Sequence, residues 1–387
     1  MVNALSAGAM RLQPRLASFY LFYYATVGAF MPYWSPYLAA RGFSPVQMGI
    51  AYALMGMMRT VVPLAWGSYA DRHGGRIKLI RGASLAALIL FLMIPFMPSV
   101  LWVGVMMMGY TVFWHALLPQ FEAVTLSHLA VIRGDYARVR LWGSVGFIIT
   151  VLGLGLLLDH TGIIWLPWLV GLFWFGMALS TWTVPEPPAF HLNQTEHASI
   201  WIALKNPVAL ALLFACFCSQ LSYAPYYNFF TLFLERHHYA HAYIGLLWTL
   251  GVLAEIVMFM IIARVIGTIG SRKVMLIALA ATGLRWTAIA AAVDSLAILL
   301  LAQLLHALSF AAYHAVAMHY VQRLFPGALQ GRGQAVYNAV AYGIGGSIGS
   351  IASGYLWQDL SPEAVFYSAA AVALLGFWVA YRKLPAL

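Results

Sequence analysis

A single carboxylate lies deep inside one of the apolar stretches of this 387-residue sequence. The stretch 244–263 reads IGLLWTLGVLAEIVMFMIIA, which is long enough for a helix to cross the hydrocarbon core of a bilayer, and its charged residue is Glu255. An ionised carboxylate at that depth is costly unless it is paired, protonated or in contact with water. Because burial favours the neutral acid, we expect Glu255 to take up and release a proton. The alternative is a structural carboxylate paired with an arginine of a neighbouring helix.

Three further polar side chains, Arg285, His306 and His314, lie in later apolar stretches. Their spacing of eight residues places the two histidines about 80° apart on an α-helix, so both fit one broad face. Imidazole titrates near neutrality and can relay protons, so we expect these three groups to tune Glu255. Alternatively, the histidines are hydrogen-bonded residues of a helix interface. Because the histidines of the span 296–322 include no i, i+4 pair, we expect no metal site there. We also expect no cofactor and no catalytic site.

Arg59, Glu122 and Arg140 complete the set of candidate charges inside or beside the apolar stretches. The set holds three arginines and two glutamates, and protonation of Glu255 would widen the positive excess. Buried positive charge favours an anionic ligand, and arginine binds a carboxylate through two parallel hydrogen bonds. The alternative is that Glu122 and Arg140 are solvated residues at a helix–loop junction.

Aromatic residues interleaved with small ones accompany the charges of the second half. Most of them should pack between helices or lie at the membrane interface. We expect a few to line the substrate site, and the candidates are Tyr223, Tyr227, Trp248 and Tyr313.

The composition is that of a multi-span membrane protein, with 63% hydrophobic and 8% charged residues and a mean hydropathy of +0.83. The net charge of +10 is not concentrated in a basic stripe, so we expect a lipid bilayer and no nucleic acid as partner. Cys216 and Cys218 lie in one apolar run and indicate neither a disulfide framework nor a metal site.

Twelve membrane spans can be drawn, which places both termini on the same side. Arg41 and Arg236 lie on one side, and all basic residues outside the spans other than these two lie on the opposite side. The positive-inside rule makes that side cytoplasmic, so we expect a bacterial inner-membrane protein with both termini in the cytoplasm. The predicted spans are 16–38, 46–69, 77–96, 100–125, 138–158, 162–183, 204–229, 242–264, 273–293, 296–322, 333–357 and 362–382.

The sequence divides into two halves that resemble each other. A shift of 196 residues aligns Gly49 with Gly245, and Arg76 with Arg272. Repeated six-span halves are typical of secondary transporters, whose substrate site lies at the repeat interface. We expect an N-terminal bundle at 1–184, a cytoplasmic linker at 185–200 and a C-terminal bundle at 201–387.

The loop after the second span reads GSYADRHGGR over residues 67–76. It resembles the Gly-x-x-x-Asp-Arg-x-Gly-Arg-Arg signature of the major facilitator superfamily. The resemblance implies an all-α fold of twelve transmembrane helices in two pseudo-symmetric bundles, and a conformational latch in this loop. The implied latch residues are Gly67, Asp71, Arg72, Gly74 and Arg76.

Nearly the whole chain resembles the branch that holds lactose permease and the phenylpropionate-type permeases. Residues 28–38, GAFMPYWSPYL, are similar to the first helix of that branch. Glu122 and Arg140 match the acid and arginine that hold the sugar, and Phe147 matches the aromatic ring that stacks on it. Arg285 and His306 match an arginine and a histidine of the proton-coupling cluster.

Two departures weaken the sugar interpretation, because Ser309 replaces an expected glutamate and Val252 replaces the acidic sugar-binding residue of span eight. We therefore expect a monomeric, proton-coupled symporter of a small aromatic carboxylate that works by alternating access. An oligosaccharide or nucleoside symporter is the alternative. We expect no enzyme, since no nucleophile–base pair or metal set lies at membrane depth.

Overall fold

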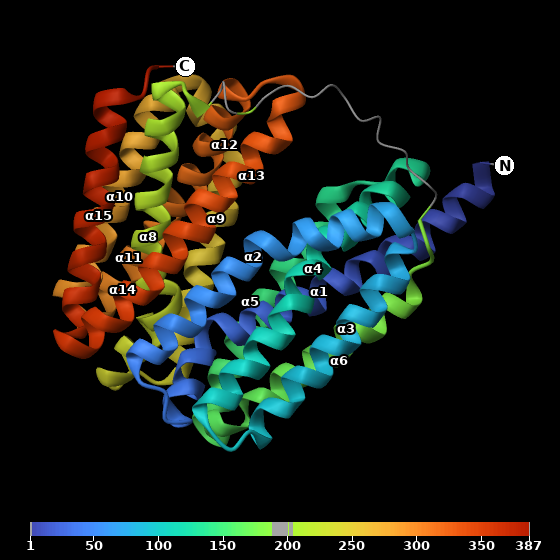
Figure 1. Ribbon diagram of the computed structural model, residues 1–387, viewed down its shortest axis with the longest axis horizontal. Coiled ribbons are helices and arrows are strands. Elements are labelled where there is room, and N and C mark those ends of the chain that lie inside the picture. Colours follow the sequence, from blue (N-terminus) through green and yellow to red (C-terminus); the bar gives the residue numbers. More distant parts are fainter. Residues whose placement is uncertain (1, 188–199, 201–203, 387) are drawn as a thin grey trace. The chain divides into compact units, whose positions relative to one another are not determined.

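The computed structural model describes residues 2–187, 200 and 204–386, and within these ranges the chain is helical without a strand (Figure 1). Ten of the described helical segments are long and apolar enough to cross a membrane. Most of the predicted linker lies outside the described residues. The first half contains α1 (Val2–Ala40), α2 (Pro45–His73), α3 (Arg76–Met93), α4 (Val100–Ile132), α5 (Tyr136–Thr161) and α6 (Leu166–Thr183).

The second half follows the same plan but breaks two of its spans into shorter pieces. It contains α8 (Pro207–Arg236), α9 (His241–Ile269), α10 (Ser271–Ala291), α11 (Leu296–Leu304), α12 (Tyr313–Leu324), α13 (Gln330–Asn338), α14 (Gly346–Asp359) and α15 (Pro362–Lys383). The break in the tenth span is the π-helix η3 (Ala307–Ala312), and the break in the eleventh is the π-helix η5 (Ala339–Gly345). The predicted spans 296–322 and 333–357 thus each contain one π-helical segment.

Helix starts follow from capping side chains that satisfy free backbone N–H groups. Asp135 accepts a hydrogen bond from Ala137 N at the start of α5, and Asn206 accepts one from Val208 N at the start of α8. Between α2 and α3, Gly74 and Gly75 both have positive φ, a conformation that glycine adopts without steric cost. The motif glycine at 74 thus permits the tight turn that ends α2.

Backbone packing divides the chain into two compact units, 1–43 with 58–192, and 44–57 with 193–387. In the first unit, α1 packs on α5 and α6, and α3 packs on α4 and α6. In the second, α8 packs on α14 and α15, and α10 packs on α15. The division runs through α2, because its first part packs closely on α14.

Small residues create this close approach of the first part of α2 to α14. Ser347 Oγ donates a hydrogen bond to the Ala53 carbonyl at 2.8 Å. A Cβ atom added at Gly354 would lie 2.6 Å from the Pro45 carbonyl oxygen, so only glycine fits there without a shift. The predicted boundaries of the two bundles, drawn from sequence alone, assign all of α2 to the first half.

Candidate functional site

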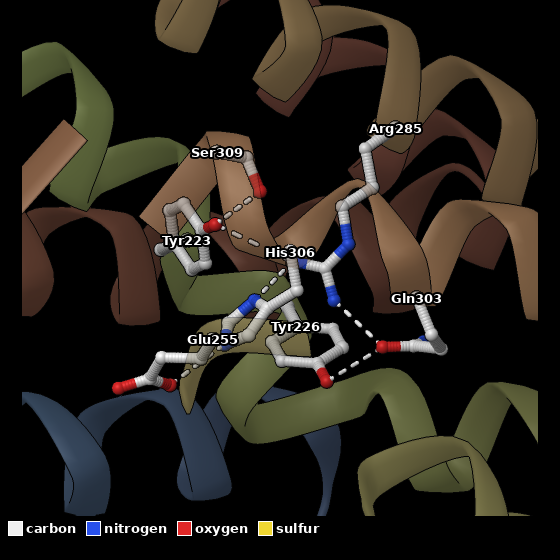
Figure 2. Close-up of polar contacts among 7 residues, drawn as sticks. All are labelled: Tyr223, Tyr226, Glu255, Arg285, Gln303, His306 and Ser309. Carbon is white, nitrogen blue, oxygen red and sulfur yellow. Dashed lines mark hydrogen bonds and ion pairs between the residues drawn. The ribbon is translucent and has the colours of Figure 1, made fainter. Parts of the chain in front are cut away.

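The guanidinium of Arg285 on α10 is fully buried and is the centre of a polar cluster in the second unit (Figure 2). Arg285 Nη2 donates to Gln303 Oε1 at 2.8 Å, and Nη1 donates to the Tyr223 hydroxyl at 3.3 Å. Nη1 also lies 2.8 Å from His306 Nδ1. Every hydrogen bond of this cation to a described residue therefore ends on a neutral or titratable group and not on a carboxylate.

Aromatic rings cover the faces of the guanidinium. Its carbon lies 4.2 Å from the centre of the Tyr226 ring and 4.7 Å from that of Trp286. Such contacts attract a cation electrostatically when water is excluded. The Tyr226 hydroxyl also donates to Gln303 Oε1 at 3.0 Å, so the ring is held in position by the same amide oxygen that binds Arg285.

The contact with Arg285 determines which nitrogen of His306 carries the proton of a neutral ring. Arginine can only donate, so His306 Nδ1 must accept, and the N–H is then at Nε2. His306 Nε2 lies 3.5 Å from Glu255 Oε2. One imidazole thus connects the Glu255 carboxylate to the buried cation, as Figure 2 shows.

Glycine brings α9 close to this cluster. A Cβ atom added at Gly251 would lie 3.3 Å from Gln303 Oε1 and 3.5 Å from His306 Cδ2. Glu255 follows four residues later, on the same side of the helix. The close approach of α9 therefore places the carboxylate beside the histidine, while 23% of the Glu255 side chain stays exposed.

Two donors of the cluster are buried without a hydrogen-bond partner among the described residues. They are Arg285 Nε and Gln303 Nε2. Buried polar groups normally have partners, and such exceptions require a physical explanation. These donors are suited to an acceptor group brought by a ligand.

His314 lies beside two tyrosine hydroxyl groups. Its Nδ1 lies 3.3 Å from the Tyr342 hydroxyl and 3.5 Å from that of Tyr337. The Phe310 ring lies between the two histidine rings, with centroids 5.1 Å from His306 and 6.2 Å from His314. The structure thus brings together three of the four residues predicted for proton coupling and places the fourth beyond a phenyl ring.

The aromatic residues predicted to bind substrate differ in exposure. Tyr223 is fully buried, and its hydroxyl donates to Ser309 Oγ at 2.7 Å. Tyr313 is also fully buried and donates to the Cys216 carbonyl, while Trp248 is buried and donates to Thr231 Oγ1. Tyr227 is half-buried. These contacts favour a packing role for Tyr313 and Trp248.

The first unit holds the other predicted charges, and tyrosines bind two of them. The Tyr136 hydroxyl donates to Glu122 Oε1 at 3.0 Å. Arg140 donates to the Tyr24 hydroxyl, and its guanidinium carbon lies 4.0 Å from the centre of the Tyr24 ring. Arg59 also lies near enough to interact electrostatically with Tyr24. Glu122 and Arg140, which the sequence predicts to bind substrate, are thus each bound to a phenol.

Phe147 and the predicted latch also lie in the first unit. Phe147 is buried, and its backbone lies close to Gly28 of α1. Asp71 pairs with Arg76, and Arg76 Nη1 donates to Gln120 Oε1 on α4 at 2.6 Å. The motif loop is therefore attached to α4 through Gln120. Arg72 is exposed.

Sequence reasoning missed the partners Tyr24, Tyr136 and Gln120. No spacing connects Tyr24 to Arg140, which are 116 residues apart. The role of Gln303 carried a weak signal, since it precedes His306 by three residues and shares its side of a helix.

A family model matches residues 14–368 of this chain, and the family is described as the MFS_1 like family. The chain belongs to this family. It is a transporter of the major facilitator type and not an enzyme, and its predicted all-α membrane fold is confirmed.

Named relatives of the transporter cover most of its length. It is 30% identical to the "Probable 3-phenylpropionic acid transporter" of Escherichia coli (strain K12), over 96% of this chain and 97% of that protein. It is 24% identical to the maltose permease of Geobacillus stearothermophilus, over 93% of this chain and 92% of that protein. The crystal structure of the nucleoside transporter NupG matches with a TM-score of 0.84 at 15% identity, over 96% of this chain and 98% of that one.

Proposed function

We propose that this transporter moves a small aromatic carboxylate together with a proton, as a monomer in the bacterial inner membrane. Glu255 would carry the proton, and Arg285 would bind the carboxylate. The observation that carries the proposal is a fully buried arginine whose hydrogen-bond acceptors are a phenol, an amide and an imidazole. The name of the Escherichia coli relative, a phenylpropionic acid transporter, supports the substrate class.

The charges explain how the proton and the anion would bind together. When Glu255 is ionised, its negative charge balances Arg285 through His306, whose ring contacts both. Protonation of Glu255 removes that balance and leaves a buried cation without a counter-charge. A buried charge is stabilised by an opposite charge, so the protonated state favours entry of a substrate carboxylate.

Protonation of Glu255 would also expose the Arg285 guanidinium to the substrate. A neutral Glu255 attracts His306 Nε2 less strongly than a carboxylate does, which frees the imidazole to move away from Arg285. The substrate carboxylate would then take the place of His306 Nδ1 on Arg285 Nη1 and accept a second hydrogen bond from Nη2, which donates to Gln303 Oε1 in the structure. Two parallel hydrogen bonds from arginine suit a carboxylate geometrically.

The proposal is tested by comparing a carboxylate ligand with its neutral amide. We expect 3-phenylpropionate to bind the wild type at least about tenfold more tightly than 3-phenylpropionamide, a difference of about 1.4 kcal/mol. Arg285→Lys keeps the charge but removes the two-pronged geometry, so it should weaken acid binding about tenfold and amide binding little.

Arg272→Lys is the matched control, because Arg272 lies in the same unit and contacts the carbonyl of Tyr381 at the end of α15. The Arg272→Lys variant should bind the acid with the same affinity as the wild type. Arg140→Lys tests the other candidate arginine in the same assay. Equal binding of acid and amide by the wild type would refute the anion proposal.

A neutral oligosaccharide or nucleoside is the second candidate. It is favoured by the first unit, where Glu122 and Arg140 bind phenol hydroxyl groups and could bind sugar hydroxyl groups in the same way. The relatives include a maltose permease and a putative nucleoside transporter. Loss of neutral-ligand binding in Arg140→Lys, with none in Arg285→Lys, would support this candidate.

A further inference from the structure

The rings of His306, Phe310 and His314 form a row along one side of the tenth span. The planes of His306 and Phe310 differ by 4°, and those of Phe310 and His314 by 11°. On a regular α-helix, the first and last of these residues would point about 80° apart. Each ring follows the one before by four residues, a spacing at which rings also stack on a regular α-helix, as Phe377 and Tyr381 do on α15.

The π-helix η3 covers Ala307–Ala312, so the helix departs from α-helical geometry within this row of rings, at the segment that includes Phe310. A π-helical turn holds more residues than an α-helical turn, so it changes the direction of every side chain that follows. Such segments are rare and occur frequently at functional sites. Here the segment lies directly after His306, the residue that contacts Arg285 and Glu255.

Phe310 is half-buried, whereas Ser309, Ala311 and Ala312 next to it are buried. Its ring also lies 5.9 Å from that of Tyr223, which is tilted by 59°. The Tyr227 ring, also half-buried, lies 5.6 Å from Tyr223. A phenyl group that is partly exposed among other rings offers a surface on which another ring can pack.

We propose that Phe310 determines specificity by packing against an aromatic ring of the substrate while Arg285 binds the substrate's carboxylate. This inference rests on the proposed function and adds the group that is recognised besides the charge. The His306 ring connects Phe310 to the guanidinium, since it contacts both. The matching ligand is an acid whose ring and carboxylate are joined by a short aliphatic linker.

The test compares two acids that differ in aromaticity, 3-phenylpropionate and 3-cyclohexylpropionate, each measured with its amide. Aromatic pairs contribute about 0.5–1.5 kcal/mol beyond area burial, which corresponds to roughly twofold to tenfold in affinity. We expect the wild type to prefer the phenyl acid by that factor. Phe310→Leu should lower the ratio of the two affinities to about one while the preference for acid over amide remains.

Phe310→Tyr keeps the ring and should keep the ratio. Phe377→Leu is the matched control, because Phe377 is a half-buried phenylalanine of the same unit that stacks on Tyr381, and the ratio should not change. If Phe310→Leu does not fold, Phe310→Met removes the ring with a flexible side chain of similar size.

An unchanged ratio in a folded variant without the ring would overturn the inference, and so would a lost ratio in Phe310→Tyr. Failure of the proposed function looks different. In that case acid and amide bind the wild type equally, whatever the ratio between phenyl and cyclohexyl ligands.

Discussion

Glu255 and Arg285 lie at the two ends of a short chain of contacts and differ in exposure. The carboxylate is partly exposed, whereas the guanidinium is fully buried. Between them, His306 accepts from Arg285 at Nδ1, so a second proton on its ring would require this hydrogen bond to break. Glu255 can gain a proton without breaking that bond, and it is therefore the better candidate for the titrating group.

Replacing Glu255 by glutamine should separate proton coupling from substrate movement. The neutral amide mimics the protonated acid permanently, so Glu255→Gln should exchange labelled substrate across the membrane but not accumulate it under a pH gradient. Proteoliposome uptake measures both activities. Glu363→Gln, at the start of α15, is the control and should accumulate normally. Accumulation against a gradient by Glu255→Gln would exclude the proposed role.

His306 offers a test of the tautomer deduced from its contacts. A glutamine at this position can accept from Arg285 with its oxygen and donate to Glu255 with its amide nitrogen, as the neutral imidazole does. His306→Gln should therefore keep pH-driven uptake within about tenfold of wild type, equivalent to about 1.4 kcal/mol. His306→Leu can form neither hydrogen bond and should lose pH-driven uptake. If both variants lose uptake equally, the imidazole itself must titrate.

At the scale of the helices, sequence patterns predicted the elements but not their irregularities. Long apolar runs and the caps at Asp135 and Asn206 are local signals, so the helices could be predicted. The π-helices η3 and η5 depend on packing against α8, α9 and α10, which no local pattern records.

Two glycines of α14 permit a prediction at the scale of the helices. A Cβ atom added at Gly349 would lie 2.8 Å from the Ala224 Cβ of α8, whereas one at Gly346 would meet nothing within 4 Å. Overpacking costs about 1–3 kcal/mol, so Gly349→Ala should lower the Tm in detergent by several degrees. Gly346→Ala is the matched control and should leave the Tm unchanged. Equal Tm values for the two variants would contradict this packing argument.

The loop after α2 should affect conformational change and not binding. Asp71→Asn removes the charge that pairs with Arg76 and loosens the attachment of the loop to Gln120. We expect turnover to slow while the substrate Kd stays within about threefold, a shift below 1 kcal/mol. Asp135→Asn serves as the control, because asparagine can still cap the start of α5 and this aspartate lies outside the loop. A tenfold loss of affinity with normal turnover would argue against a latch.

For the whole molecule, the repeat predicted two six-helix halves, but it could not predict that α2 would be divided. The contact of Ala53 with Ser347 connects residues 294 positions apart. Both side chains are small and uncharged, so neither their charge nor their spacing in the sequence predicts that they meet. The site was predictable in the same limited way. Isolated charges in apolar stretches identified Glu255 and Arg285, whereas their neutral partners looked like ordinary packing residues.

The distribution of basic residues predicts the orientation of the chain in the membrane. Both native cysteines are buried, so single introduced cysteines can be labelled selectively. We expect Ala40→Cys, after α1, to react with a membrane-impermeant thiol reagent in intact cells. His73→Cys, at the end of α2, should react only after permeabilisation. The reverse pattern would place the termini outside.

The burial of Arg285 also has a consequence for how the chain enters the membrane during synthesis. An arginine at the centre of a helix costs about 2.5–3.5 kcal/mol on leaving the translocation channel. The acceptors Gln303 and His306 lie 18 and 21 residues further along the chain, so they are synthesised after α10. We therefore expect α10 to be retained at the channel beside α8 until α11 has emerged. Helices α10 and α11 should then enter the lipid together as a hairpin.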